Sequence, residues 1–276
     1  MPESLANTPD DFTTRSWLFP PKTREVQFDE KWSYVHKKQA NCDLDDPADD
    51  HRGDCWDHTA IDPESRLVLA VVPGPRDVEA VEEVVGEVKD RTGGRVLDLV
   101  TSDEYPAYRT ALLNAYGVEV TTTARGRRVR KMVPEKVPPA GMNYATVEKR
   151  RSKGRVVEIV RRVVFGTMAS VAAALARSTA SRGINTSFVE RQNATDRHHN
   201  ARKVRKTYTF SKDWAVHQAM TYFTMYSYNF CWPVRTLREP IGEGRWRQRT
   251  PAMAAGLADH VWTIREWITI PGVQRP

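Results

Sequence analysis

Residues 66–105 read RLVLAVVPGPRDVEAVEEVVGEVKDRTGGRVLDLVTSDEY, and this stretch decides the fold class. A nearly continuous apolar run opens it, which predicts a buried strand. Valines then recur at helical spacing before a Gly-Gly pair, which predicts a helix with a glycine C-cap: Val78, Val81, Val84, Val85 and Val88. A second apolar run follows and ends on polar residues at Asp103. Strand, helix and strand in this order predict an α/β sheet with parallel strands.

The flanking segments extend this sheet on both sides. Upstream, REVQFDEKWSYVHKK alternates and is rich in β-favouring residues, which predicts a strand over 25–37. CWDHTAID follows an acidic loop and predicts a second strand, so the first three strands should form an antiparallel meander. Downstream, PAYRTALLNAYG predicts a second helix and VEVTTT a fifth strand. We therefore expect an α/β fold with a mixed sheet, parallel strands at its centre and flanking helices.

The amino-acid composition changes after the predicted fifth strand. Residues 125–136 are basic and broken by proline, which favours an exposed arm, and a basic β-hairpin is expected near 149–162. A helix ending at Gly183 should follow, and then a second helix, carrying Glu190, capped near Thr186. An aromatic helix and one closing amphipathic helix complete the chain. The predicted organisation is a lead-in at 1–24, a main domain at 25–215 with a basic insert at 119–183, and a helical extension at 216–276.

Charge is unevenly distributed along the chain. The 276 residues carry a net charge of +7, but residues 119–212 hold 22 Lys and Arg against 6 Asp and Glu. The rest of the chain holds 20 basic against 29 acidic residues. Segregation on this scale indicates a surface built for a polyanion, and nucleic acid is the common one.

Cysteine content and hydropathy narrow the class of protein. The cysteines Cys42, Cys55 and Cys231 are few and odd in number, which favours a reducing compartment over a disulfide framework. The N-terminus is acidic and polar, so no signal peptide is expected. The longest weakly polar run, FGTMASVAAALA, has 12 residues, too few to cross a membrane. We expect a soluble, cytoplasmic protein without a membrane partner.

Three carboxylates occupy positions that this fold can bring together. Asp29 lies within the first predicted strand, Asp103 ends the first parallel strand, and Glu190 begins a late helix. Open α/β sheets bind their ligands at the carboxyl ends of such strands. Converging carboxylates repel one another unless a hard divalent cation binds between them. Two such ions about 4 Å apart can activate an attacking oxygen and stabilise a leaving one in phosphodiester chemistry.

Each carboxylate also has a simpler interpretation. Asp29 could be a strand residue beside an ordinary ion pair, Asp103 could cap the next helix, and Glu190 could be a solvated helix residue. Asp57 competes with Asp29 for the first place in the triad, whereas Asp62 fits a turn better.

The cysteines and histidines of the same region offer a different kind of site. Cys42, His51, Cys55 and His58 could bind zinc, but their spacing matches no common zinc motif.

Several segments resemble the catalytic blocks of bacterial D-D-E transposases of the insertion-sequence-one family. They are FDEKWSYV at 28–35, TSDEYPAY at 101–108, NTSFVERQNATDRHHNARKVRKTYTFSK at 185–212 and the tail segment TPAMAAGL at 250–257. The third block is the most specific. The resemblance covers roughly residues 25–260 and implies a ribonuclease-H-like fold, so 25–215 would be the catalytic domain.

The resemblance also implies a chemistry and a set of roles. Asp29, Asp103 and Glu190 would bind Mg²⁺ as two ions, with Mn²⁺ able to substitute, for cleavage and transfer of DNA strands at insertion-sequence ends. Arg197 corresponds to the family's basic residue on the same helix face. Cations following it on that helix would then bind DNA phosphates: Arg202, Lys203, Arg205 and Lys206.

The implied partners are double-stranded DNA, as transposon ends and target, and further copies of this chain on DNA. Family members usually carry a DNA-binding region ahead of the catalytic domain, and only 24 residues precede the first predicted strand. We therefore expect an upstream-frame DNA-binding protein, or a truncated or domesticated copy. The alternatives are a ribonuclease-H-like metal-dependent nuclease and an inactive DNA-binding protein.

Overall fold

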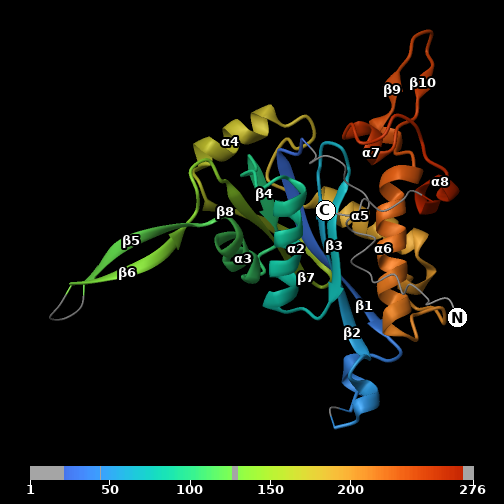
Figure 1. Cartoon of the computed structure of the whole chain (residues 1–276), viewed down its shortest axis with the longest axis horizontal. Coiled ribbons are helices and arrows are strands. Elements are labelled where there is room, and N and C mark those ends of the chain that lie inside the picture. The colour runs from blue at the N-terminus through green and yellow to red at the C-terminus, as the bar shows by residue number, and fades with distance from the viewer. Residues whose placement is uncertain (1–21, 44, 126–129, 270–276) are drawn as a thin grey trace, which may run out of the picture.

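The computed structural model of the protein describes residues 22–43, 45–125 and 130–269, and a six-stranded sheet forms its centre (Figure 1). The strand order is β3-β2-β1-β4-β7-β8. The strands are β1 (Glu25–Val35), β2 (Gly53–Ile61), β3 (Val68–Gly74), β4 (Leu99–Ser102), β7 (Tyr144–Ser152) and β8 (Arg155–Phe165).

Both strand directions occur in this sheet. β1, β2 and β3 form the predicted antiparallel meander, while β1–β4 and β4–β7 pair in parallel. β8 returns antiparallel to β7. The parallel crossover from β3 to β4 runs through α2 (Val78–Arg91), which begins at an Asp77 cap. The mixed sheet with flanking helices is therefore confirmed.

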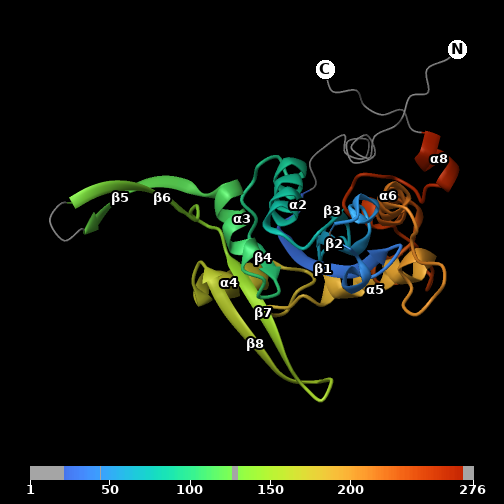
Figure 2. The same cartoon turned by 90° about the horizontal axis from the view of Figure 1, so that it is seen from below.

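Helices cover both faces of the sheet (Figure 2). On one face, α2 and α3 (Ala107–Tyr116) pack on residues such as Val26, Phe28 and Val100. On the other face, α6 (Trp214–Cys231) covers β3, and α4 (Met168–Arg177) covers β4 and β7. α5 (Ser187–His199) lies on this second face against β1 and β2. Because side chains alternate along a strand, every second residue of β1 faces α5.

The fifth predicted strand lies elsewhere than expected. β5 (Val118–Arg125) pairs with β6 (Arg130–Val137) in a separate hairpin that extends away from the main sheet (Figure 1). Within the exposed arm predicted at 125–136, residues 130–136 form part of β6, and 126–129 lie outside the described residues. A regular ladder opposite β5 outweighs the proline at 134, because a proline is tolerated in an edge strand.

The basic insert proposed for 119–183 is only partly separate. β7 and β8 form the expected hairpin, but β7 is an integral strand of the main sheet, paired in parallel with β4. The predicted helix of this segment is α4, with a Thr167 capping box. The lead-in at 1–24 lies mostly outside the described residues.

The C-terminal part contains less helix than predicted. The single closing helix is replaced by α7 (Pro251–Ala254) and α8 (Ile264–Thr269), separated by a non-helical stretch at 255–263 that contains Gly256. Gly256 has a φ of 77°, a left-handed conformation that ends a helix. Short elements complete the chain: η1 (Gln39–Asn41), η2 (Pro47–Asp49), η3 (Ala201–Lys203), η4 (Arg235–Leu237), β9 (Glu239–Pro240) and β10 (Trp246–Arg247). Within the described residues, every helix is too short or too polar to cross a bilayer.

Candidate functional site

The sheet register places Asp29 near Asp103. β1 and β4 pair in parallel up to Gln27 and Thr101, and Asp29 and Asp103 each lie two residues farther along the chain, with Asp103 just past the end of β4. Gln27 faces α5, where its Oε1 accepts from the backbone N–H of Phe188 at 3.0 Å. By alternation Asp29 faces α5 as well, whereas Asp103 lies past the end of β4 and close to Arg76, the ion partner of Glu30.

Helix α5 carries Glu190 toward Asp29 and Asp103. These three carboxylates, with Asn193 and Lys149, are called the corner below. Its first turn is formed when the N–H of Glu190 donates to Thr186 O at 3.1 Å. One turn later, Asn193 Nδ2 donates to Asp29 Oδ2 at 2.8 Å, which joins the helix to β1. Lys149 of β7 extends its ammonium to both carboxylate oxygens of Glu190. Four elements far apart in sequence, β1, β4, α5 and β7, thus supply these side chains.

The electrostatics of Asp29 reflect the neighbouring carboxylates. Burial raises its pKa to about 7, and the negative charges of Glu30, Asp103 and Glu190 contribute to this rise. The hydrogen bond from Asn193 opposes the rise by stabilising the carboxylate. A carboxyl group whose pKa is raised by burial and by neighbouring negative charges is common at functional sites.

The donor set suits a hard divalent cation. It consists of carboxylate oxygens, and the side chains of Asp103 and Glu190 are 37% and 39% exposed, which leaves room for further ligands. The ligand atoms of the three carboxylates do not all lie within 4.8 Å of one another. Among the described residues, the group that meets this distance is Cys55, Asp57 and His217. Instead the Lys149 ammonium neutralises Glu190 and competes with a cation for it.

Asp103 is also held by local contacts. Its Oδ1 accepts from the N–H of Tyr105 at 3.0 Å, and its Oδ2 lies 3.7 Å from Arg76 Nη2. It does not cap α3, whose N-cap position is Pro106 without a side-chain cap. The predicted capping alternative for Asp103 is therefore wrong, although the residue does form the turn before the helix.

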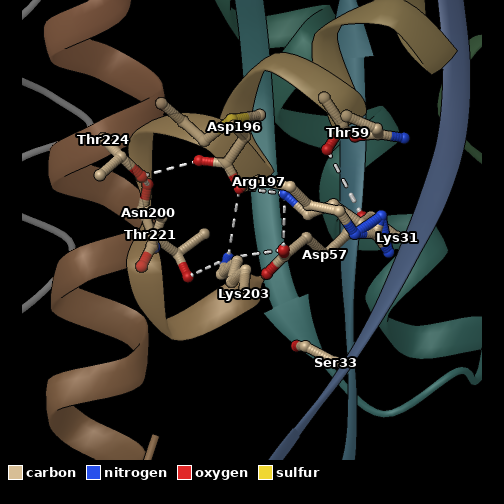
Figure 3. A network of polar contacts seen from close by, with 12 residues as sticks. Lys31, Ser33, Asp57, Thr59, Asp196, Arg197, Asn200, Lys203, Thr221 and Thr224 are labelled. Carbon is tan, nitrogen blue, oxygen red and sulfur yellow. Dashed lines mark hydrogen bonds and ion pairs between the residues drawn. The ribbon is translucent and has the colours of Figure 1, made fainter. Parts of the chain in front are cut away.

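Asp57, the rival of Asp29, belongs to a buried network of four charges (Figure 3). Its Oδ2 lies 2.5 Å from Lys203 Nζ and 3.1 Å from Lys31 Nζ. The Lys31 ammonium also contacts Asp196 of α5, and all four side chains are at most 1% exposed. Burial alone would raise the pKa of Asp57, but Lys203 and Lys31 hold it below its usual range. Asp57 is thus a structural ion partner, and Asp29 takes the position near Asp103.

This network corrects the interpretation of Lys203. A side chain that is 1% exposed and donates to Asp57 and Thr221, each at 2.5 Å, cannot contact a DNA phosphate. The predicted DNA-binding role of Lys203 is wrong. The buried Asp57 and Asp196 attract this lysine inward because their charges would otherwise be uncompensated.

The remaining predicted cations occupy two different settings. Arg197 lies on α5 as expected, but its guanidinium is half-buried and donates from Nη2 to Trp32 O at 3.0 Å. Arg202, Arg205 and Lys206 do not continue the helix, because α5 ends at His199 and a 3₁₀ turn follows. The single cationic helix expected for Glu190 and these residues is therefore wrong. Arg205 and Lys206 are exposed on the loop, with Arg202 half-buried beside them.

The zinc site considered for the cysteines and histidines is not formed. Within the described residues, Cys42, His51, Cys55 and His58 do not gather into a ligand set. The compact group of Cys55, Asp57 and His217 fits a metal poorly. Burial raises the pKa of the Cys55 thiol to about 12, so it keeps its proton, and two ammonium groups already neutralise Asp57. Asp62 forms the predicted turn, accepting from Ser65 Oγ at 2.8 Å.

Two residues of the corner were missed from sequence. Asn193 stands three residues after Glu190 in a polar helix, and this i,i+3 spacing signals a shared face. Lys149 was counted only as part of a basic hairpin. No local signal connects it to Glu190, 41 residues away, because the contact depends on β7 entering the main sheet.

Comparison of the chain with protein-family models, with curated proteins and with solved structures gave no match. The functional conclusion therefore depends on the residues and their geometry.

Proposed function

We propose that this chain is the catalytic part of a D-D-E transposase, which cleaves and transfers DNA strands with divalent metal ions. The observation that carries the proposal is the packing of α5 on β1: Asn193, three residues after Glu190, donates to Asp29 at 2.8 Å, and β1 pairs with β4, which Asp103 follows. Asp29, Asp103 and Glu190 are the three carboxylates that the resemblance to insertion-sequence-one transposases selects, and they come from separate elements.

The architecture supports the proposal. An antiparallel meander followed by two parallel pairings is compatible with a ribonuclease-H-like sheet. Asp103 directly follows β4, and the ends of such strands are where open α/β sheets bind ligands. The corner is open to solvent through Asp103 and Glu190, as a site for a polymeric substrate must be.

The residues of the corner have separate roles in this proposal. Asp29, Asp103 and Glu190 would hold Mg²⁺ or Mn²⁺, which when bound would stabilise the attacking and leaving oxygens of the phosphodiester. Asn193 orients Asp29 through its 2.8 Å hydrogen bond. Lys149 neutralises Glu190 in the absence of a cation and is placed to bind a substrate phosphate once Glu190 is otherwise engaged.

Exposed cations on both sides of this corner would bind the DNA backbone. On one side the loop after α5 presents Arg205 and Lys206. On the other, the tip of the β7–β8 hairpin is exposed and basic, and Figure 2 shows it projecting on the side of the sheet that carries α5. Its exposed cations are Arg150, Arg151, Lys153 and Arg155. Such contacts attract DNA irrespective of sequence.

The test is a strand-cleavage and strand-joining assay with labelled duplex in Mg²⁺ or Mn²⁺, comparing Asp103→Asn with Asp98→Asn. Asp98 precedes the same strand and is 38% exposed, against 37% for Asp103, so the pair is matched in exposure and chemistry. We expect Asp103→Asn to lose cleavage and Asp98→Asn to retain it. If the wild type cleaves DNA but does not join strands, it is a nuclease. If it binds DNA but does not cleave it, it is an inactive DNA-binding protein. Equal activity of both variants would refute the site.

A further inference from the structure

A cavity of about 350 Å³ lies farther along β1 than the carboxylates. β4 pairs with β1 only as far as Gln27, so the β1 edge beyond it is covered by the loop that follows α5. Val35 bridges to Ser211 of this loop, and the N–H of His36 donates to Ser211 O at 2.7 Å. The cavity lies between this edge and the loop, and is lined by Trp32, Ser33, Tyr34, Lys38, residues 202–206 and Phe210.

Three aromatic rings form one wall of the cavity. The rings of Trp32 and Tyr34 lie 5.7 Å apart, and that of Phe210 lies 5.0 Å from Tyr34. All three residues are only half-buried, so part of each remains accessible to solvent. Lys212 Nζ lies 3.0 Å from the ring centroid of Phe210, and Lys38 Nζ lies 6.0 Å from that of Trp32, so a ligand can stack only on the ring surface that these ammonium groups leave open. Partly exposed rings are suited to stack against flat aromatic groups, and nucleobases are such groups whatever their sequence.

The other wall is cationic. Arg202, Arg205 and Lys206 line this wall, while Lys38 lies over the Trp32 ring on the aromatic side. Within the described residues, none of these four cations has a carboxylate within ion-pair distance. No carboxylate is among the described residues that line it. A cavity with unpaired cations on one side and aromatic rings on the other matches the two parts of a nucleotide, its phosphate and its base.

The buried charge network keeps this loop in place. Lys203 stands between Arg202 and Arg205 in sequence, and its ammonium is anchored to Asp57 of β2. The side chain of Asn200 also accepts from the N–H of Arg202 at 3.1 Å. The neighbouring cations are thereby directed to the cavity before any ligand arrives, which reduces the entropy lost on binding.

We propose that this cavity binds an unpaired nucleotide of a DNA strand, with its base against Trp32, Tyr34 and Phe210 and its phosphate against Arg202, Arg205 and Lys206. Trp32 and Tyr34 lie three and five residues beyond Asp29, roughly 10–17 Å along an extended strand. The binding itself does not depend on catalysis. Only the idea that the unpaired segment leads to the carboxylates rests on the proposed transposase function.

The test measures anisotropy of a labelled oligothymidylate and of a labelled duplex, with the full chain in EDTA so that cleavage cannot occur. Phe210→Leu and Tyr34→Leu keep apolar volume but remove the flat ring. Tyr208→Leu is the matched control, because Tyr208 belongs to the same loop, is 96% exposed and does not line the cavity. Thermal unfolding shows whether each variant is folded, and Phe210 lies on the loop, where substitution endangers the fold least.

We expect Phe210→Leu and Tyr34→Leu to weaken single-strand binding by roughly five- to 150-fold, the range found when one base loses its stacking partner. Duplex binding and the Tyr208→Leu control should stay unchanged. Single-strand affinity of folded Phe210→Leu equal to wild type would overturn the proposal, and so would an equal loss on duplex. Either result leaves the transposase proposal standing, because that depends on metal-dependent cleavage and the Asp103→Asn comparison.

Discussion

Replacing Lys203 by Met tests whether this lysine stabilises the fold or binds DNA. The change removes one ammonium from a network in which Asp57 is 0% exposed and the lysine 1%. Removing one partner of a buried ion pair costs about 3–5 kcal/mol, because the other charge stays buried without compensation. Lys31 still lies 3.1 Å from Asp57 and offsets part of this loss. We therefore expect a loss of ~3 kcal/mol, a large part of the ~5–15 kcal/mol typical of a domain.

The assay is urea unfolding followed by circular dichroism at neutral pH. Arg205→Met is the matched control, since Arg205 lies two residues away on the same loop and is exposed. Its free energy of unfolding should change by no more than about 0.5 kcal/mol. The double variant Asp57→Asn with Lys203→Met should lose less stability than the two single variants summed. Both charges of the ion pair are then removed, so neither is left buried without its partner.

The opposite pattern would refute the buried role. If Lys203→Met were as stable as wild type and lost DNA affinity as Arg205→Met does, then the lysine would be a surface cation. The loop after α5 would in that case differ from the arrangement in Figure 3.

Three further outcomes are expected. Asp29→Asn should stabilise the protein at pH 8 but not at pH 4. The pKa of Asp29, about 7, lies above the ordinary aspartate value, so the free energy of unfolding of the wild type falls as pH rises between these two values. Because the side chain is only partly buried, equilibrium unfolding at pH 8 should show a gain of ~1–2 kcal/mol for the variant. Glu190→Gln should bind duplex as wild type does yet lose Mn²⁺-dependent cleavage, whereas Glu158→Gln, 54% exposed on the hairpin, should retain both; undiminished cleavage by Glu190→Gln would return that residue to a surface role. Replacing Arg202, Arg205 and Lys206 together by Ala should reduce the slope of log affinity against log salt by about 0.9 for each DNA phosphate that is no longer neutralised, and an unchanged slope would remove this loop from the DNA path.

Much of the fold could be predicted because its signals are local. The valine spacing of α2, the alternation in β1 and the Lys-Gly turn of the β7–β8 hairpin each depend on a few neighbouring residues. The position of β5 could not be predicted in this way. Its sequence favours a strand, but a strand's partner depends on which edge is nearer in space, and β6 rather than β4 provides that edge.

The candidate site divides along the same line. Asp103 was selected by its strand-end position, and Asp29 and Glu190 by the sequence blocks that resemble the transposase family, since the type of residue and its place in an element carry that information. The contributions of Asn193 and Lys149 depend on contacts between α5 and two strands, and they became evident only when those elements were packed.

The sequence by itself determined that the chain has an α/β sheet, a strongly basic segment at 119–212 and an acidic residue, Asp103, at a strand end. It could not determine which cations face the solvent. Counted along the chain, Lys203 and Arg205 are equivalent, but Asp57, 146 residues from Lys203, draws one of them into the interior. Only the tertiary structure decided this, because the charge of a side chain is a property of its type, whereas its burial depends on partners distant in sequence.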